Sequence, residues 1–312
     1  MVRRRIVASL LALAACASPP PTAATPPTAD GRGDASGGDA AAPSDDGGRA
    51  GCPRVADAES TGALTAAEID EASGIVQSTR NPGVYWVHND SGDSARAFAV
   101  APNGELVATL TFDTTAPVDV EDIAIEDVSA DASYLYLADI GDNAAARTSI
   151  TIHRVSEPKL DGTTEIAATS EKMRVRYADG AQDAETLLFD PETRELLIVT
   201  KTFGAAAVHR VGPFVAGGDA TTEKVASVDV VLATGGEVAR NGRRIGVRNY
   251  GRAYMWTRAP GEALADALAR PPCDLPLATE RQGESFAFLA DGSGYVTVSE
   301  GRGAKLHVSK FE

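Results

Sequence analysis

Hydrophobic residues between Glu71 and Phe311 occur in short runs that are separated by turn-forming residues. The apolar positions within the runs alternate with polar ones or form continuous patches, as in half-buried and buried β-strands. Pro, Gly, Asn and Asp gather between the runs, where hairpins need them. The pattern predicts an all-β domain. One short helix is expected over residues 262–270, because Pro271 and Pro272 stop it.

The runs recur as five copies of an acid followed by an apolar strand, which begin at Glu71, Glu121, Glu185, Glu237 and Glu284. Each copy continues with a second and a third run, and all but the last have a fourth. A repeat of about 50 residues built from strands and turns predicts a β-propeller, here with five blades. Residues before Glu71 should supply the outer strand of the last blade and close the ring. A degenerate sixth blade in the longer interval between Glu121 and Glu185 is the alternative.

The chain begins MVRRRIVASLLALAAC, with three arginines, a short apolar core and small residues before Cys16. These features predict a lipoprotein signal peptide over residues 1–15, with Cys16 as the lipid-bearing first residue of the mature chain. An ordinary signal peptide with a chance cysteine is the alternative. Residues 16–51 are rich in Ala, Pro, Gly and Asp, and we expect a disordered tether there, followed by the propeller over residues 52–312. The expected location is the bacterial cell envelope, lipid-anchored and extracytoplasmic.

Cys52 and Cys273 remain as a pair in an oxidising compartment, which predicts a disulfide. Closure of the ring would bring the Cys52 segment beside the outer edge of the fourth blade, where Cys273 falls. Removal of three arginines with the signal peptide changes the formal net charge of −15 to −18. Such acidity argues against nucleic acid and anionic lipid surfaces as partners, so the lipid anchor is the only membrane contact we expect.

The first strand of a propeller blade lines the central channel, and its start lies on the same side as the end of the second strand. The five repeated glutamates are therefore predicted to gather at one mouth of the channel. The second strands should deliver candidate ligand-binding residues to that mouth: Asn89, Asp90, Asp139, Lys201, Arg248, Asn249 and Glu300. Clustered carboxylates raise one another's pKa, and calcium, a hard cation that takes oxygen ligands, would satisfy them. Lys201 and Arg248 could do the same without metal.

The alternative for the glutamates is structural, because residues repeated in every blade can hydrogen-bond neighbouring blades and cement the ring. Two Asp- and Gly-rich loops, residues 89–93 and 139–143, resemble fragments of calcium loops, although tight turns have the same composition. His88 is the histidine nearest the mouth and the candidate base, with a packed strand histidine as the alternative. The sequence contains no nucleophile elbow, phosphate loop or zinc-type cluster.

The phrases NPGVYWVHNDSGD, VEDIAI, YLADIGDN, DAETLLFDP and RQGESFAF resemble a family of secreted bacterial propellers of the TolB-like and NHL-like kind. More distantly, the acid before the strand is similar to calcium-dependent propeller hydrolases, namely phytase-like esterases and lactonases of the gluconolactonase and paraoxonase type. That resemblance implies metal ligands at Glu71, Glu121, Asp139, Glu185 and Glu284. Those enzymes usually have six blades, and this chain carries Lys201 and Arg248 where further oxygen ligands would be expected.

Three functions are compatible with these features. The first is a lipoprotein whose acidic, calcium-loaded mouth binds a small molecule, glycan or peptide of the cell envelope. The second is a calcium-dependent hydrolase, in which the metal polarises an ester or phosphoryl oxygen and His88 or Glu185 activates water. The third is an assembly scaffold that holds a partner on the rim of a blade.

Overall fold

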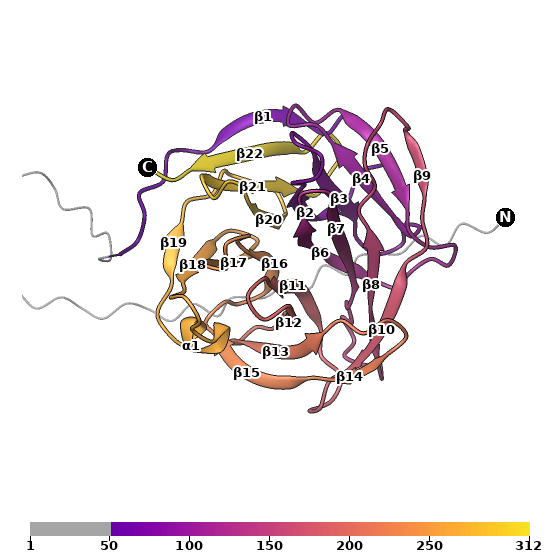
Figure 1. Cartoon of the computed structure of the whole chain (residues 1–312). Coiled ribbons are helices and arrows are strands. Elements are labelled where there is room, and N and C mark those ends of the chain that lie inside the picture. Colours follow the sequence, from indigo (N-terminus) through magenta and orange to yellow (C-terminus); the bar gives the residue numbers. More distant parts are fainter. Residues whose placement is uncertain (1–50) are drawn as a thin grey trace, which may run out of the picture. The chain divides into compact units, whose positions relative to one another are not determined.

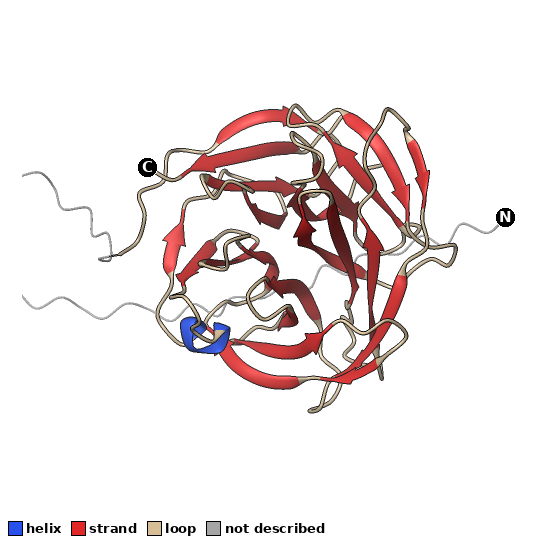
Figure 2. Cartoon of the chain, viewed as in Figure 1, coloured by secondary structure: helices blue, strands red, loops and turns tan. Residues whose placement is uncertain are grey.

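The computed structural model describes residues 51–312 of the chain. The predicted signal peptide, Cys16 and nearly all of the predicted tether lie outside the described residues. Strands of the described part form five small sheets arranged in a ring (Figures 1 and 2). The domain is therefore a β-propeller with five blades, as the repeat predicts.

Each blade begins with its innermost strand. Blade 1 contains β2 (Ala72–Gln77), β3 (Tyr85–Asn89), β4 (Arg96–Val100), β5 (Leu106–Thr111) and β9 (Glu165–Ala167). Blade 2 contains β6 (Val120–Ser129), β7 (Ala132–Asp139), β8 (Ile150–Ser156), β10 (Glu171–Arg176) and β14 (Asp219–Thr221). Blade 3 contains β11 (Ala184–Asp190), β12 (Glu195–Thr200), β13 (Ala206–Pro213) and β15 (Glu223–Val228). Blade 4 contains β16 (Ala233–Val238), β17 (Arg244–Asn249), β18 (Ala253–Thr257) and β19 (Cys273–Leu275). Blade 5 contains β20 (Gly283–Phe288), β21 (Gly294–Ser299), β22 (Lys305–Lys310) and β1 (Glu59–Ala63).

The core consists of apolar layers between neighbouring blades. Trp86 of blade 1, for example, packs in one cluster with Ile123 and Leu137 of blade 2, and all three are almost fully buried. Burying a side chain of this size stabilises a domain by about 1.5 to 3 kcal/mol. Both faces of the inner strands are covered in this way, which explains why their sequences contain continuous apolar runs.

The long interval between Glu121 and Glu185 holds no sixth blade. Its extra residues run back to blade 1, where β9 adds a parallel strand to the outer edge of β5. In the same way β14, from the connection in blade 3, adds a parallel strand to β10 of blade 2. The predicted helix is present as α1 (Leu264–Leu268), which packs against the cluster that contains Val228 of β15. These additions cover strand edges that would otherwise invite pairing with other chains.

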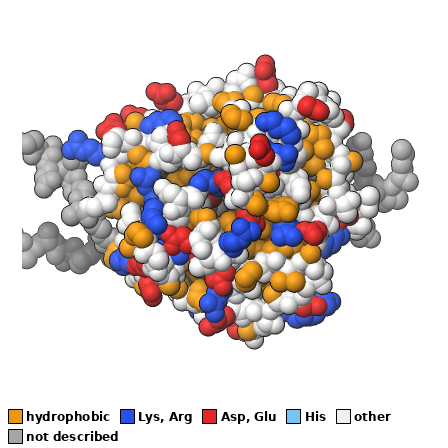
Figure 3. Space-filling view, in the orientation of Figure 1, with side chains coloured by type: hydrophobic (Ala, Val, Ile, Leu, Met, Phe, Trp, Pro, Cys, Tyr) orange, Lys and Arg blue, Asp and Glu red, His pale blue; other side chains and the backbone are white. Residues whose placement is uncertain are grey.

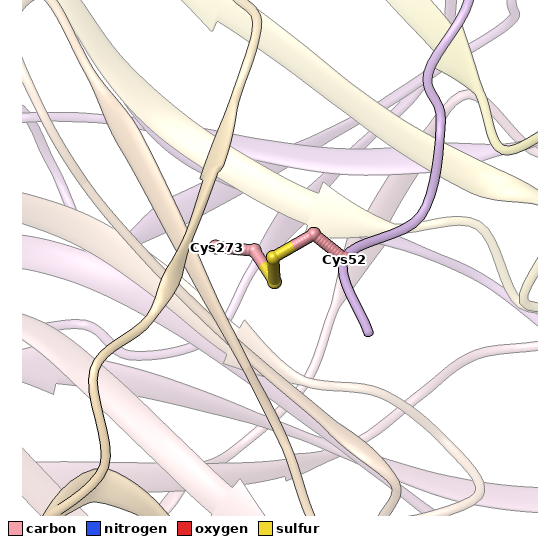
Figure 4. The surroundings of a disulfide bond; sticks show 2 residues. All are labelled: Cys52 and Cys273. Atoms are coloured by element: carbon pink, nitrogen blue, oxygen red, sulfur yellow. A yellow bond between two sulfur atoms is a disulfide. The ribbon is translucent and has the colours of Figure 1, made fainter. Parts of the chain in front are cut away.

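The ring closes as the sequence predicts. Strand β1 pairs antiparallel with β22, so the N-terminal segment completes the last blade. Cys52 and Cys273 form a disulfide with a Cα–Cα distance of 5.5 Å, which ties this segment to the outer strand of blade 4 (Figure 4). Acidic and basic side chains are interspersed on the face seen in Figure 3, so the negative charge of the chain is not gathered in one patch there.

Candidate functional site

A β-bulge stands near the start of the first strand in every blade. The extra residue of each bulge has no partner in the second strand, and these residues are Ser73, Glu121, Glu185, Thr234 and Glu284. Each is polar and each is at most 5% exposed. Bulges re-aim side chains and are frequent beside functional sites. The sequence therefore folds into a ring of five buried polar residues at one end of the channel, of which three are glutamates.

Two of the five repeated glutamates lie outside this ring. Glu71 is exposed and lies two residues before the bulge residue Ser73. Glu237 lies three residues beyond Thr234, inside the channel, where its carboxylate accepts the Phe288 N–H at 2.6 Å and pairs with Arg240 at 2.6 Å. The expectation that all five glutamates gather at the mouth is thus wrong for Glu237, because the bulge and not the acid defines the equivalent position.

The last residues of the second strands mostly hold the backbone in place. Asn89 accepts the Glu71 N–H at 3.3 Å, and Asp139 accepts the Asp119 N–H at 3.0 Å. Asn249 donates to the Val231 carbonyl at 3.0 Å. Each therefore braces the segment that leads into the first strand of its own blade. Asp139 also pairs with Arg147 at 2.9 Å, so its carboxylate holds the loop that follows its strand.

The residues one position further along do reach the mouth, and three of them were expected there: Asp90, Lys201 and Glu300. Carboxylate oxygens of Asp90, Glu284 and Glu300 all lie within 4.8 Å of one another. A second group, Asp90, Asp119 and Glu121, meets the same limit. Blades 5, 1 and 2 thus bring five carboxylates together, and Asp90 belongs to both groups.

Burial is the main cause of strongly shifted pKa values in this cluster, and repulsion between the carboxylates adds to it. These effects raise the pKa of Asp90 to about 6 and that of Glu284 to about 9. The pKa of Asp119 rises to about 6, and that of Glu121 rises well above its ordinary value. Without a compensating cation, part of the cluster therefore holds protons near neutral pH.

Lys201 is a basic residue of this mouth on the side of blade 3, and Arg147 lies near Asp119 on the side of blade 2. The ammonium group of Lys201 contacts a carboxylate oxygen of Glu185 and lies 5.3 Å from the ring centre of Tyr250. Glu185 raises the pKa of Lys201 despite its burial. Burial raises the pKa of Glu185 to about 7, against the effect of Lys201. Tyr250, which sequence reasoning missed, occupies the position in blade 4 that is equivalent to Lys201.

Two predicted site residues lie away from the mouth. His88 is completely buried, its Nδ1 lies 2.9 Å from the Asn89 carbonyl oxygen, and burial lowers its pKa to about 4. A neutral imidazole without access to solvent is poorly placed to act as a base at the mouth. Arg248 is also completely buried and pairs with Glu280 at 2.8 Å, so it belongs to the packing between blades 4 and 5.

Asp122, which sequence reasoning also missed, fastens the inner strands together below the mouth. Its carboxylate is 1% exposed and accepts the N–H groups of Ile123 at 2.8 Å and Leu187 at 2.9 Å. The Gly236 N–H is a third donor to it. One side chain therefore joins the first strands of blades 2, 3 and 4. A groove of about 620 Å³, lined by Gln77, Tyr85 and other residues, lies at the opposite ends of the first strands of blades 5 and 1.

Comparison with protein-family models and with curated proteins finds no match for the chain. Over residues 51–312, no helix has the length and apolar character needed to cross a bilayer. The acidic mouth is thus the main evidence for what the propeller does.

Proposed function

We propose that the protein is an exported bacterial lipoprotein whose propeller binds calcium at the acidic mouth and uses it to hold a small molecule, glycan or peptide of the cell envelope. The observation that carries the proposal is the Glu284 carboxylate. It is 3% exposed, and its Oε2 atom receives no hydrogen bond from an N–H or hydroxyl group of the described residues, although the carboxyl group is hydrogen-bonded to that of its acidic neighbour Glu300. A buried polar atom without a partner is costly, so its position beside Asp90 and Glu300 favours a bound cation.

The residues of the mouth offer the oxygen ligands that calcium prefers, and Gly141 leaves room for them. Calcium takes several oxygen ligands, mainly carboxylates and carbonyls. Gly141 lies against Asp119 and Glu121, and a Cβ atom at this position would collide with both carboxylates. The glycine therefore leaves room for acidic groups that a larger residue would displace. Lys201 neutralises Glu185 on the opposite side and leaves the acids of blades 5, 1 and 2 for a cation.

Export and anchoring rest on the sequence, through the signal peptide and Cys16. The Cys52–Cys273 disulfide supports an oxidising compartment. Membership of the secreted TolB-like and NHL-like propellers is part of the same proposal. Three exposed apolar side chains, Val118, Phe203 and Val231, lie on loops at the ends of strands that meet at the mouth. They favour a ligand that has an apolar part beside the group held by the cation.

The test is a thermal melt of the purified chain with Cys16→Ser, which removes the lipid attachment site, in chelator and across a calcium titration. Calcium should raise the melting temperature by linkage. Glu284→Gln should weaken the response strongly, and Glu105→Gln, an exposed glutamate far from the mouth, should leave it unchanged. A melting temperature that calcium does not move would refute the proposal.

A calcium-dependent hydrolase is the second candidate, and the position of Glu185 favours it. A general base works best with a pKa near the working pH, and the pKa of Glu185 rises to about 7 beside Lys201. If the mouth is catalytic, Glu185→Gln should abolish turnover of lactones, esters or phosphoesters while the calcium-dependent melt is retained. Equal turnover in the variant and the parent protein would exclude Glu185 as the base.

A further inference from the structure

The two groups of carboxylates at the mouth share one residue. Asp90 lies at the end of the second strand of blade 1, between Glu284 and Glu300 of blade 5 and Asp119 and Glu121 of blade 2. Its Oδ1 accepts the Ser91 N–H at 2.6 Å, and no other hydrogen bond to its carboxylate is found within residues 51–312. Oxygen lone pairs therefore remain free to face both groups.

Each group contains a buried carboxylate that pairs with no basic group. On the side of blade 5, this is Glu284: its Oε2 atom receives no N–H or hydroxyl donor from the described residues, its Oε1 accepts the Gln282 amide at 3.4 Å, and its carboxyl group is hydrogen-bonded to that of Glu300. On the side of blade 2, it is Glu121, which is 2% exposed and whose carboxylate receives no hydrogen bond or ion pair from the described residues. The two carboxylates project from the bulges of different blades. The mouth therefore has two separate positions at which a buried carboxylate lacks a basic partner. A single cation at one position would not compensate the carboxylate at the other.

Lys201 and Arg147 compensate only part of the charge of the two groups. The Lys201 ammonium group acts on Asp90 and Glu121 from a distance, but it contacts Glu185 and lies over the face of Tyr250. Arg147 acts on Asp119 but pairs with Asp139 at 2.9 Å. Five carboxylates remain around Asp90. When metal binding displaces the protons of the cluster and all five carboxylates are ionised, one divalent cation would leave an excess of negative charge in a mostly buried cluster, whereas two would bring four positive charges to it.

We propose that the mouth binds two divalent cations with Asp90 as their shared ligand. One cation lies among Asp90, Glu284 and Glu300, and the other among Asp90, Asp119 and Glu121. This inference rests on the proposed calcium-binding function and adds the number of ions and the ligands of each. The shared carboxylate predicts that the binding of both ions depends on Asp90, while each outer ligand serves one ion.

The number of bound ions is the test, measured by equilibrium dialysis of the purified protein against radioactive calcium. The parent protein should bind two ions. Asp119→Asn and Glu300→Gln should each bind one, since each removes a ligand of a different ion. Asp90→Asn should lower the binding affinity for both ions at least tenfold. Circular dichroism and the melt in chelator check that each variant is folded.

The outcomes separate this inference from the function on which it rests. One bound calcium in the parent protein would overturn the two-ion site and leave a calcium-binding mouth intact. No bound calcium would overturn both. If Asp119→Asn and Glu300→Gln each abolish all binding, the ions do not occupy separate positions, and the assignment of ligands is wrong. Manganese gives an independent readout, because two ions that share a carboxylate should show a spin-coupled electron paramagnetic resonance signal and a single ion should not.

Discussion

The pH dependence of stability tests the electrostatics of the mouth directly, and Glu284 contributes strongly to it. Its pKa rises from an ordinary value of 4.5 to about 9 in the folded domain, chiefly through burial. Between these values the unfolded chain has lost the proton and the folded domain still holds it. The contribution of Glu284 to stability is therefore complete at low pH and is lost as the pH rises toward 9. The acids with smaller upward shifts, Asp90 and Asp119, act in the same direction.

The size of the effect follows from proton linkage. One extra proton in the folded state lowers the free energy of unfolding by about 1.4 kcal/mol for each unit of pH. From about pH 5.5 to about pH 8.5, Glu284 alone then lowers it by up to about 4 kcal/mol. For a domain of this size, this corresponds to roughly 10 °C in melting temperature. Calcium should oppose this loss of stability, because it stabilises the ionised carboxylates. The increase in the free energy of unfolding that calcium causes should therefore grow with pH.

Urea denaturation in chelator, followed by tryptophan fluorescence across this pH range, measures the effect. Glu284→Gln cannot ionise, so its free energy of unfolding should fall less steeply with pH. The difference in slope should be up to about 1.4 kcal/mol per pH unit, which corresponds to one proton. It should be more stable than the parent protein at the alkaline end. Glu105→Gln serves as the control and should follow the parent curve. Parallel curves for Glu284→Gln and the parent protein would show that Glu284 is ionised in the folded domain and would refute the reasoning.

Three further predictions concern the framework around the site. Asp122→Ala removes the acceptor of three buried N–H groups and should lower the free energy of unfolding by roughly 3 to 6 kcal/mol in urea denaturation, and a loss below about 1 kcal/mol would contradict the anchor. Replacing Cys52 and Cys273 by serine opens a loop of 221 residues, and the loss should approach about 5 kcal/mol by chain entropy, with reduction of the parent protein as a check. Arg248→Met leaves Glu280 charged and buried and should cost about 3 to 5 kcal/mol, much of which Glu280→Gln should restore. Because Arg248 lies outside the mouth, its loss should not change the calcium response.

Most of the fold could be predicted because the strands repeat. The acid, the apolar run and the turn recur in each blade, and the closing strand and the disulfide then follow from the geometry of a ring. The edge strands β9 and β14 could not be predicted, because their residues, Glu165–Ala167 and Asp219–Thr221, are short, mostly exposed and without an apolar pattern. They become strands only because the neighbouring blade offers an open edge.

The site could be predicted in its position but only in part in its members: Asp90, Glu121, Glu284 and Glu300 were expected at the mouth, together with residues that lie elsewhere. Side chains at a strand end alternate in direction, so a shift of one residue separates Asn89, which braces the backbone, from Asp90, which faces the mouth. The bulge adds a further residue to each first strand, and no letter of the sequence marks it. For this reason Glu237 looked equivalent to Glu284 although it lies deeper in the channel.

Buried acids elsewhere in the domain show what glutamates that only cement the blades look like. Each of them has a basic or hydrogen-bonding partner: Glu126 with Arg194 and Tyr136, Glu157 with Trp86 and Asn81, Asp190 with Arg258, Glu237 with Arg240, and Glu280 with Arg248. At the mouth, Glu185 follows this rule through Lys201. Among the described residues Glu121 has no such partner, and Glu284 has no basic partner, only the Gln282 amide at 3.4 Å and the Glu300 carboxyl group, although both are as deeply buried as the others. A purely structural role therefore accounts for one of the three mouth glutamates, and the proposed cation would account for the other two.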